Sequence, residues 1–103
     1  IIKLAQKGNI EKIEIDTAHF KGNYPDRASI QATSIDKNIT TKDLIQNSDN
    51  WNIILDETKL SADNIHKYKI NSNSKNEATH IRLNIYPDGG VSRLRIFGTK
   101  LDD

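Results

Sequence analysis

Apolar and polar residues alternate in several short segments, as expected for strands with one buried face. In residues 12–17, Ile13 and Ile15 alternate with charged side chains, and the same pattern recurs at 28–33, 51–55, 66–70, 81–85 and 94–96. The stretches between them, at 22–26, 36–50 and 71–77, are polar or rich in turn residues. Only residues 1–7 and 40–47 are predicted to form short helices. The sequence therefore predicts an all-β fold, an antiparallel β-sandwich.

The last two strand segments predict a hairpin across Pro87-Asp88-Gly89-Gly90. If Tyr86 pairs with Val91, Leu83 faces Leu94 and both apolar sets fall on one side.

The other side of this hairpin would place Arg82 opposite Arg95, Asn84 opposite Arg93 and His80 opposite Phe97. Like charges directly across two strands are destabilising. An anion is therefore expected among these arginines: a carboxylate from elsewhere in the chain, a partner or a substrate. Because Tyr86, Val91 and Phe97 would share this side, we expect something to cover it.

Composition narrows the function classes. The 103 residues fit a single domain, 1–103. A net charge of +1 argues against binding to nucleic acid or to anionic membranes through bulk charge. The chain has no cysteine, which excludes disulfides, thiolate nucleophiles and Cys-ligated metals. No apolar run could span a membrane and no signal peptide is visible, so a cytoplasmic location is expected. With no methionine and a start at Ile1-Ile2, the chain is expected to be one module of a longer protein.

Two blocks carry a family resemblance. The first is Asp16-Thr17-Ala18-His19-Phe20-Lys21-Gly22-Asn23-Tyr24-Pro25-Asp26, and the second runs from Thr79 through Tyr86-Pro87-Asp88-Gly89-Gly90 to Gly98. Together with Trp51, His66 and Tyr68 in order between them, they resemble the allantoicase family. The resemblance covers roughly residues 1–98.

The resemblance implies a jelly-roll sandwich similar to galactose-binding domains, in proteins that carry two tandem repeats. This chain is more similar to the second repeat. Family members hydrolyse allantoate to ureidoglycolate and urea in purine degradation. The implied partners are allantoate and a second repeat or another copy of the chain, and the isolated repeat is expected to be folded but inactive.

Allantoate carries a carboxylate and two ureido groups on one carbon. Releasing urea requires an acid, a base that delivers water, and cations for the carboxylate. Arg82, Arg93 and Arg95, with Asn84 beside them, are the candidate clamp, because guanidinium binds carboxylate in a bidentate manner. Alternatively, these arginines pair with Asp16, with Asp26 or with an acid of a neighbouring module.

His19 is the candidate acid or base, since it follows a strand end and imidazole is the side chain best suited to proton transfer at neutral pH. It could instead hydrogen-bond to backbone in a tight corner. Asp16 could orient His19 or bridge to an arginine. Asn23 could donate to a ureido oxygen or serve the turn. Asp88 is mainly a turn residue and a more remote candidate base.

No cofactor is required by this chemistry. A metal held by Asp16 and His19 with His66 or His80 is a weaker alternative, because no closely spaced pair of histidines exists. His66 is interpreted as a strand residue and Trp51 as core. The rival hypothesis is a non-catalytic ligand-binding or assembly module of galactose-binding type, since fold alone does not fix function. The polar run at Asp16–Asn23 favours the enzyme.

Overall fold

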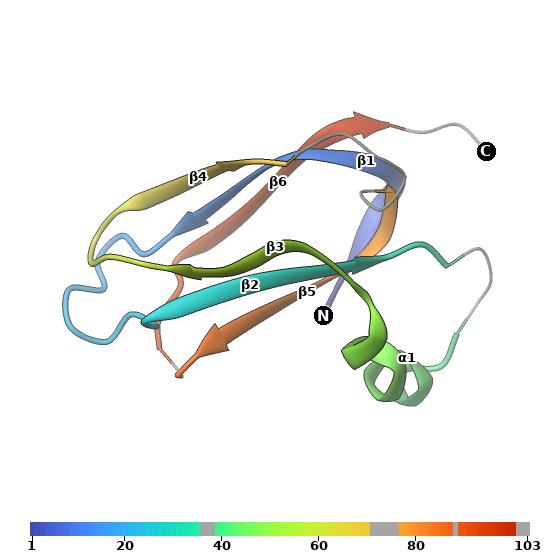
Figure 1. Ribbon diagram of the computed structural model, residues 1–103, viewed down its shortest axis with the longest axis horizontal. Coiled ribbons are helices and arrows are strands. Elements are labelled where there is room, and N and C mark those ends of the chain that lie inside the picture. Colours follow the sequence, from blue (N-terminus) through green and yellow to red (C-terminus); the bar gives the residue numbers. More distant parts are fainter. Residues whose placement is uncertain (36–38, 71–76, 88, 101–103) are drawn as a thin grey trace.

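The computed structural model describes residues 1–35, 39–70, 77–87 and 89–100. In these residues, strands arranged in two layers dominate the fold (Figure 1). The elements in chain order are β1 (Ile2–Asp16), β2 (Arg27–Thr33), α1 (Thr41–Asn47), the 3-10 turn η1 (Ser48–Asn50), β3 (Asn52–Lys59), β4 (Ile65–Lys69), β5 (Glu77–Tyr86) and β6 (Arg93–Lys100). All the strand pairs are antiparallel, which confirms the predicted fold class.

One of the two predicted helices is wrong. Residues 1–7 do not form a helix but lie mostly in β1, where Ile2 pairs with Ile81 and Lys3 with His80. A helix of seven residues is marginal on its own, whereas pairing with β5 supplies partners for the backbone. The helix expected at 40–47 is confirmed as α1, and Thr40 caps it by accepting a hydrogen bond from the Asp43 backbone N–H at 3.1 Å.

Strand β1 joins the two layers. Its first part pairs with β5, which continues through β2 to β3. Its second part lies between β4 and β6. In Figure 1, β1 bends over one end of the molecule to pass from the layer of β3, β2 and β5 to the layer of β4 and β6. A register shift between Lys3 and Gly8 accompanies this change of partners.

The predicted hairpin of residues 80–97 is wrong. In the described residues β6 pairs with β1, placing Leu94 opposite Ile15, whereas β5 pairs with β2 and places Leu83 opposite Ile30. The chain after Tyr86 crosses from one layer to the other instead of turning back on itself. Alternation predicted which side of each strand is buried, but the same alternation fits any neighbour with a matching apolar side.

The core lies between the two layers. Ile13 and Ile15 from β1 and Ile30 from β2 are completely buried, as is Ile81 from β5. Complete burial of one such side chain stabilises a fold by about 1.5–3 kcal/mol. The predicted core position of Trp51 is confirmed, with 8% of its surface exposed. In the described part of the chain no helix is long and apolar enough to cross a membrane.

Candidate functional site: the loop end of the sandwich

The predicted arginine cluster does not form. Arg82 and Asn84 alternate with the core-facing residues of β5, and therefore lie on the outer side of the first layer. Arg93 and Arg95 alternate with the core-facing residues of β6, on the outer side of the second layer. Because the two strands belong to different layers, the sandwich core separates Arg82 from Arg93 and Arg95. For the same reason His80 does not lie opposite Phe97, as the hairpin had predicted. The prediction that Tyr86, Val91 and Phe97 share one covered side is also wrong.

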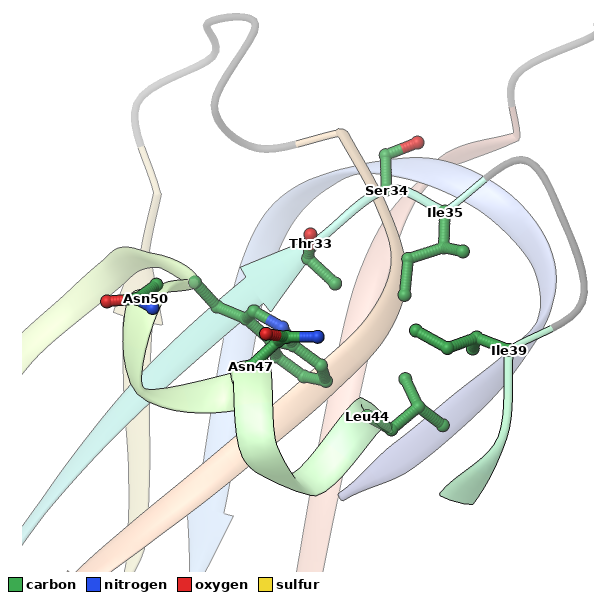
Figure 2. Close-up of a pocket in the computed structure, with 8 residues that line it drawn as sticks. Thr33, Ser34, Ile35, Ile39, Leu44, Asn47 and Asn50 are labelled. Carbon is green, nitrogen blue, oxygen red and sulfur yellow. The ribbon is translucent and has the colours of Figure 1, made fainter. Parts of the chain in front are cut away.

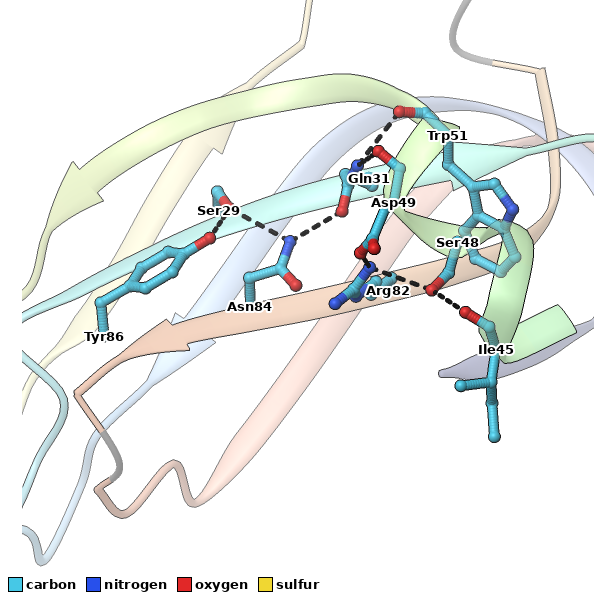
Figure 3. A network of polar contacts seen from close by, with 9 residues as sticks. All are labelled: Ser29, Gln31, Ile45, Ser48, Asp49, Trp51, Arg82, Asn84 and Tyr86. Carbon is cyan, nitrogen blue, oxygen red and sulfur yellow. Dashed lines mark hydrogen bonds and ion pairs between the residues drawn. The ribbon is translucent and has the colours of Figure 1, made fainter. Parts of the chain in front are cut away.

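On the first layer, Arg82 has partners within the chain (Figure 3). One guanidinium nitrogen donates to the Asp49 carboxylate at 2.5 Å and to the Ser48 hydroxyl at 2.9 Å. The anion expected beside this arginine is therefore a carboxylate from η1, not Asp16 or Asp26.

Neutral polar groups extend this network along β2 and β5. The Asn84 amide donates to Ser29 Oγ at 3.2 Å and to Gln31 Oε1 at 3.0 Å. Gln31 in turn donates to the backbone oxygens of Asp49 and Trp51 at 3.2 and 3.1 Å. We call this surface the β2–β5 face; its members are Ser29, Gln31, Arg82, Asn84 and Tyr86. The hydrogen bonds from Gln31 and Arg82 on this face hold η1 against the sheet.

On the second layer, Arg95 lies opposite Glu14 and contacts its carboxylate at 3.4 Å. Glu14 is nearly enclosed, with 7% exposed, and Lys12 approaches it to 3.1 Å. Hydrogen bonding to Lys12 lowers the Glu14 pKa from its usual value; burial opposes the shift, and Arg95 and Lys67 add to it. Lys12 also lies over the Phe97 ring, 5.0 Å from its centroid. Arg95, like Arg82, is thus engaged by the chain itself.

Three connecting segments meet at the end of the sandwich away from α1 (Figure 1). We call residues 17–26, 60–64 and 89–93, the last of which is the first residue of β6, the loop end. Thr17 anchors it: the side chain is completely buried, and its hydroxyl donates to the Ser61 backbone oxygen at 2.8 Å and accepts from the Asn64 backbone N–H at 3.1 Å. Position 17 thereby fixes the connection between β3 and β4 against the end of β1.

The turn after β1 is shaped by two carboxylates. Asp16 is 8% exposed and accepts a hydrogen bond from the Ala18 backbone N–H at 2.8 Å. Asp63 accepts from the His19 backbone N–H at 2.7 Å. Both His19 and Asp63 have left-handed backbone conformations, with φ of 71° and 47°. His19 therefore occupies the tight corner that was one of its two interpretations, but its backbone, rather than its imidazole, makes the hydrogen bond.

The segment before β6 packs directly on this turn. The Gly90 backbone N–H donates to the Asn23 backbone oxygen at 2.5 Å, and the Ser92 N–H donates to the Asp16 backbone oxygen at 2.7 Å. A Cβ on Gly90 would lie 2.0 Å from the Phe20 ring, so glycine is needed for the close approach. Asp88, the remote candidate base, lies outside the described residues.

Several exposed polar side chains at this end, among them those of His19, Asn23 and Arg93, have no partner in the described residues. Within residues 1–35, 39–70, 77–87 and 89–100, no hydrogen bond or ion pair holds the His19 imidazole, the Asn23 amide or the Arg93 guanidinium. Arg93 lies opposite Asp16 in the β1–β6 register, and Ser92, its neighbour, also hydrogen-bonds through its hydroxyl to the Ala18 backbone oxygen. His19 directly follows Ala18 and Arg93 directly follows Ser92, so both are next to residues that this hydrogen bond joins. This end of the sandwich thus carries an imidazole, an amide and a guanidinium, each without a partner in the described residues.

The other two histidines have structural positions. His66 lies in β4, as predicted; its Nε2 accepts from the Ser61 backbone N–H at 2.9 Å and its Nδ1 is 2.9 Å from the Ile15 oxygen. His80 is 5% exposed, and burial, with the charge of Lys3, lowers its pKa. Asp16, His19, His66 and His80 do not form the alternative metal site, because over the described residues no group of three His, Asp or Glu side chains could hold a metal ion.

Sequence reasoning missed Asp63 and Asp49. Asp63 belongs to the Ser61-Ala62-Asp63-Asn64 connection, where Asp-Asn was a readable turn signal that tolerates a left-handed backbone. Asp49 offered no such signal, because its contact with Arg82 spans 33 positions of sequence.

Comparison with known proteins agrees with this architecture. A family model described as the allantoicase repeat matches residues 1–101. The chain is 50% identical to "Probable allantoicase" of Rhizobium meliloti (strain 1021), covering 99% of this chain and 31% of that protein. It is 52% identical to "Probable allantoicase 1" of Burkholderia mallei (strain ATCC 23344), covering 96% and 29%.

Solved structures give the same result. A structure described as allantoicase aligns with a TM-score of 0.73 at 31% identity, over 94% of this chain and 26% of that one. The allantoicase of Saccharomyces cerevisiae aligns with a TM-score of 0.72 at 31% identity, over 93% and 26%. The chain spans about three tenths of the length of the curated relatives it matches. Sequence and fold agree over nearly its whole length, and the chain belongs to the allantoicase family.

Proposed function

We propose that the full-length protein hydrolyses allantoate to ureidoglycolate and urea, and that the loop end of this repeat binds the substrate. One observation carries the assignment to this end. Arg82 and Arg95 are held by Asp49 and Glu14, whereas Arg93 has no partner among the described residues and lies beside the turn that carries His19. A guanidinium without an internal anion is available to a substrate carboxylate.

The reaction replaces one ureido group by water. The oxygen of water forms a bond to the central carbon, the bond from that carbon to the ureido nitrogen breaks, and this nitrogen takes up a proton as urea leaves. In the proposed arrangement Arg93 binds the carboxylate with two parallel hydrogen bonds. His19 transfers the proton, because an imidazole exchanges protons readily near neutral pH. Asn23 donates a hydrogen bond to a ureido oxygen.

Asp16 and Asp63 act indirectly. Each carboxylate accepts a backbone N–H of the turn, from Ala18 and His19 respectively, and so holds the corner from which His19 projects. Because strand ends support the turn, its reacting groups are held in place. The proposed reaction needs no covalent nucleophile. Asp16 is thereby proposed as a positioning residue rather than as an acid or base.

Urea release from allantoate tests the proposal. The full-length protein is expected to produce one urea and one ureidoglycolate per turnover, and the 103-residue chain alone is expected to release little. Absence of urea from folded, full-length protein would contradict the enzyme and favour the ligand-binding or assembly module.

A further inference from the structure

Two residues with left-handed backbones contact each other at the loop end. In the part of the chain that the structure describes, His19 and Asp63 are the non-glycine residues with positive φ. The His19 backbone N–H donates to the Asp63 carboxylate at 2.7 Å, and the Asp63 backbone N–H donates to the Phe20 backbone oxygen at 3.1 Å. Such conformations cost free energy and persist only where the surrounding contacts hold them. The turn that carries His19 therefore depends on the contacts that fix Asp63.

The Thr17 hydroxyl fixes the chain on both sides of Asp63. It donates to the Ser61 backbone oxygen at 2.8 Å and accepts from the Asn64 backbone N–H at 3.1 Å. The Thr17 backbone N–H also donates to the Asn64 backbone oxygen at 2.9 Å. Thr17 is completely buried, so water cannot readily replace its hydroxyl. Because Ser61 and Asn64 lie on either side of Asp63, these bonds hold that residue against the end of β1.

His66 supports the same connection from β4. Its Nδ1 lies 2.9 Å from the Ile15 backbone oxygen, which can only accept, and its Nε2 lies 2.9 Å from the Ser61 backbone N–H, which can only donate. These two contacts fix the tautomer, in which Nδ1 carries the hydrogen and Nε2 accepts. Ser61 is thus held through its backbone oxygen by Thr17 and through its backbone N–H by His66.

We propose that Thr17 and His66 are positioning residues for His19, which they reach through the 60–64 connection and Asp63. The role of His19 in proton transfer rests on the proposed function, whereas the support of its turn does not. A small displacement of a reacting group can slow a reaction strongly. Loss of either support should therefore lower kcat more than it raises KM, because the contact between Arg93 and the carboxylate is left in place.

Thr17 allows a matched pair of substitutions. Thr17→Val removes the hydroxyl and nearly keeps the shape of the side chain, whereas Thr17→Ser keeps the hydroxyl. In the full-length protein, Thr17→Val is expected to lower kcat for urea release about tenfold or more with little change in KM. Thr17→Ser is expected to retain kcat within about threefold of the native value. A merely structural role would reduce the folded fraction and leave kcat per folded molecule unchanged.

Two substitutions separate the contacts of His66. His66→Gln places an oxygen near the position of Nε2, where it can accept from the Ser61 N–H. His66→Asn places a nitrogen near the position of Nδ1, which preserves a donor to the Ile15 oxygen but gives the Ser61 N–H no acceptor. We expect His66→Asn to lower kcat as Thr17→Val does, and His66→Gln to retain most of it. This pair also tests the proposal if Thr17→Val does not fold.

Amide hydrogen exchange of His19, measured by NMR on the full-length protein, tests the support of the turn without reference to catalysis. The His19 N–H is protected by its bond to Asp63. Thr17→Val and His66→Asn should each raise its exchange rate about tenfold or more, because Asp63 is then less firmly held and the bond opens more often. Thr17→Ser and His66→Gln should leave it close to the native rate.

Thr79→Val is the matched control for loss of a threonine hydroxyl. The Thr79 hydroxyl also accepts a backbone N–H, from Ile35 at 2.9 Å. Ile35 lies at the other end of the sandwich, where it lines a pocket beside α1 (Figure 2). Thr79→Val is expected to lower Tm, and to leave His19 exchange and kcat per folded molecule unchanged.

Three results would overturn the proposal. One is a His19 exchange rate within about twofold of native in both Thr17→Val and His66→Asn. Another is a loss of kcat in Thr17→Ser and His66→Gln equal to that in their partner variants, and the third is an equal loss in Thr79→Val. A native protein that releases no urea would overturn the proposed hydrolysis instead, and the exchange rates would still decide whether Thr17 and His66 hold the turn.

Discussion

The β2–β5 face and the loop end both carry residues that the sequence assigned to one substrate site, but the two regions differ in whether these side chains have partners within the chain. On the β2–β5 face, Arg82 and Asn84 donate to Asp49, Ser29 and Gln31 and leave no charge without a counter-charge. At the loop end, the side chains of His19 and Arg93 have no partner in the described residues. Polar side chains that satisfy one another stabilise the fold, whereas those left without partners at strand ends are available for chemistry.

The largest expected effect concerns His19. His19→Asn removes the imidazole but keeps a residue that tolerates a φ of 71°, so the turn is expected to survive. In the full-length protein kcat for urea release should fall about a hundredfold or more, as for loss of a general acid or base. Thermal unfolding monitored in parallel should show nearly unchanged Tm. A kcat within threefold of the native value would remove His19 from the chemistry.

A second variant tests the layering that separates the two regions. A Cβ at Gly98 would lie 2.2 Å from the Asn9 backbone oxygen, because β6 passes close to β1. Gly98→Ala is expected to lower the free energy of unfolding by about 1–3 kcal/mol, the usual cost of overpacking. Denaturant unfolding measures this loss. Native stability would indicate that β6 does not lie against β1, and would reopen the hairpin with β5.

Arg82 gives a smaller effect on stability. Arg82→Lys loses the planar contact with Asp49 and Ser48, and because Asp49 is largely exposed the expected loss is only about 1 kcal/mol, or a Tm decrease of about 4–8 °C. Arg27→Lys is the matched control, since its 3.1 Å pair with Glu57 is exposed on both sides. Equal effects of the two substitutions would show that the β2–β5 network adds nothing beyond a surface ion pair.

The smallest expected effect concerns acid stability and Glu14. The pKa of Glu14 is lowered in the folded state, mainly by Lys12, so its contribution to stability is present above its usual value of 4.5 and is lost as the pH falls through the lowered pKa. Glu14→Gln should therefore flatten the decline of unfolding free energy with acidification below about pH 4.5. An unchanged acid slope would mean that Lys12 and Arg95 do not stabilise the carboxylate.

Much of the fold could be predicted from local pattern. Alternation identified the buried sides of Ile13, Ile30 and Leu83, because burial of one side of a strand is a property of that strand alone. The neighbours of β5 and β6 could not be predicted. Alternation alone makes Ile15 and Leu83 equally suitable partners for Leu94, because each presents an apolar side chain on the buried side of its strand.

The candidate site was predictable in part for the same reason. The turn at residues 16–20 could be recognised from its own residues, and the structure places it beside Arg93. The partners of Arg82 and Arg95 could not, since Asp49 and Glu14 reach them only through the tertiary fold. Which arginine lacks a partner in the described residues depends on these distant contacts.

The most direct test of the account compares Arg93→Lys with Arg82→Lys in the full-length protein, measuring kcat/KM for allantoate and Tm on each. Arg93→Lys is expected to lower kcat/KM about ten- to hundredfold with little change in Tm, because an ammonium group cannot reproduce the two-bond grip on a carboxylate. Arg82→Lys is expected to lower Tm and leave kcat/KM per folded molecule nearly unchanged. The opposite pattern, with Arg93→Lys kinetically silent and Arg82→Lys impaired in kcat/KM, would contradict the assignment of the substrate site to the loop end.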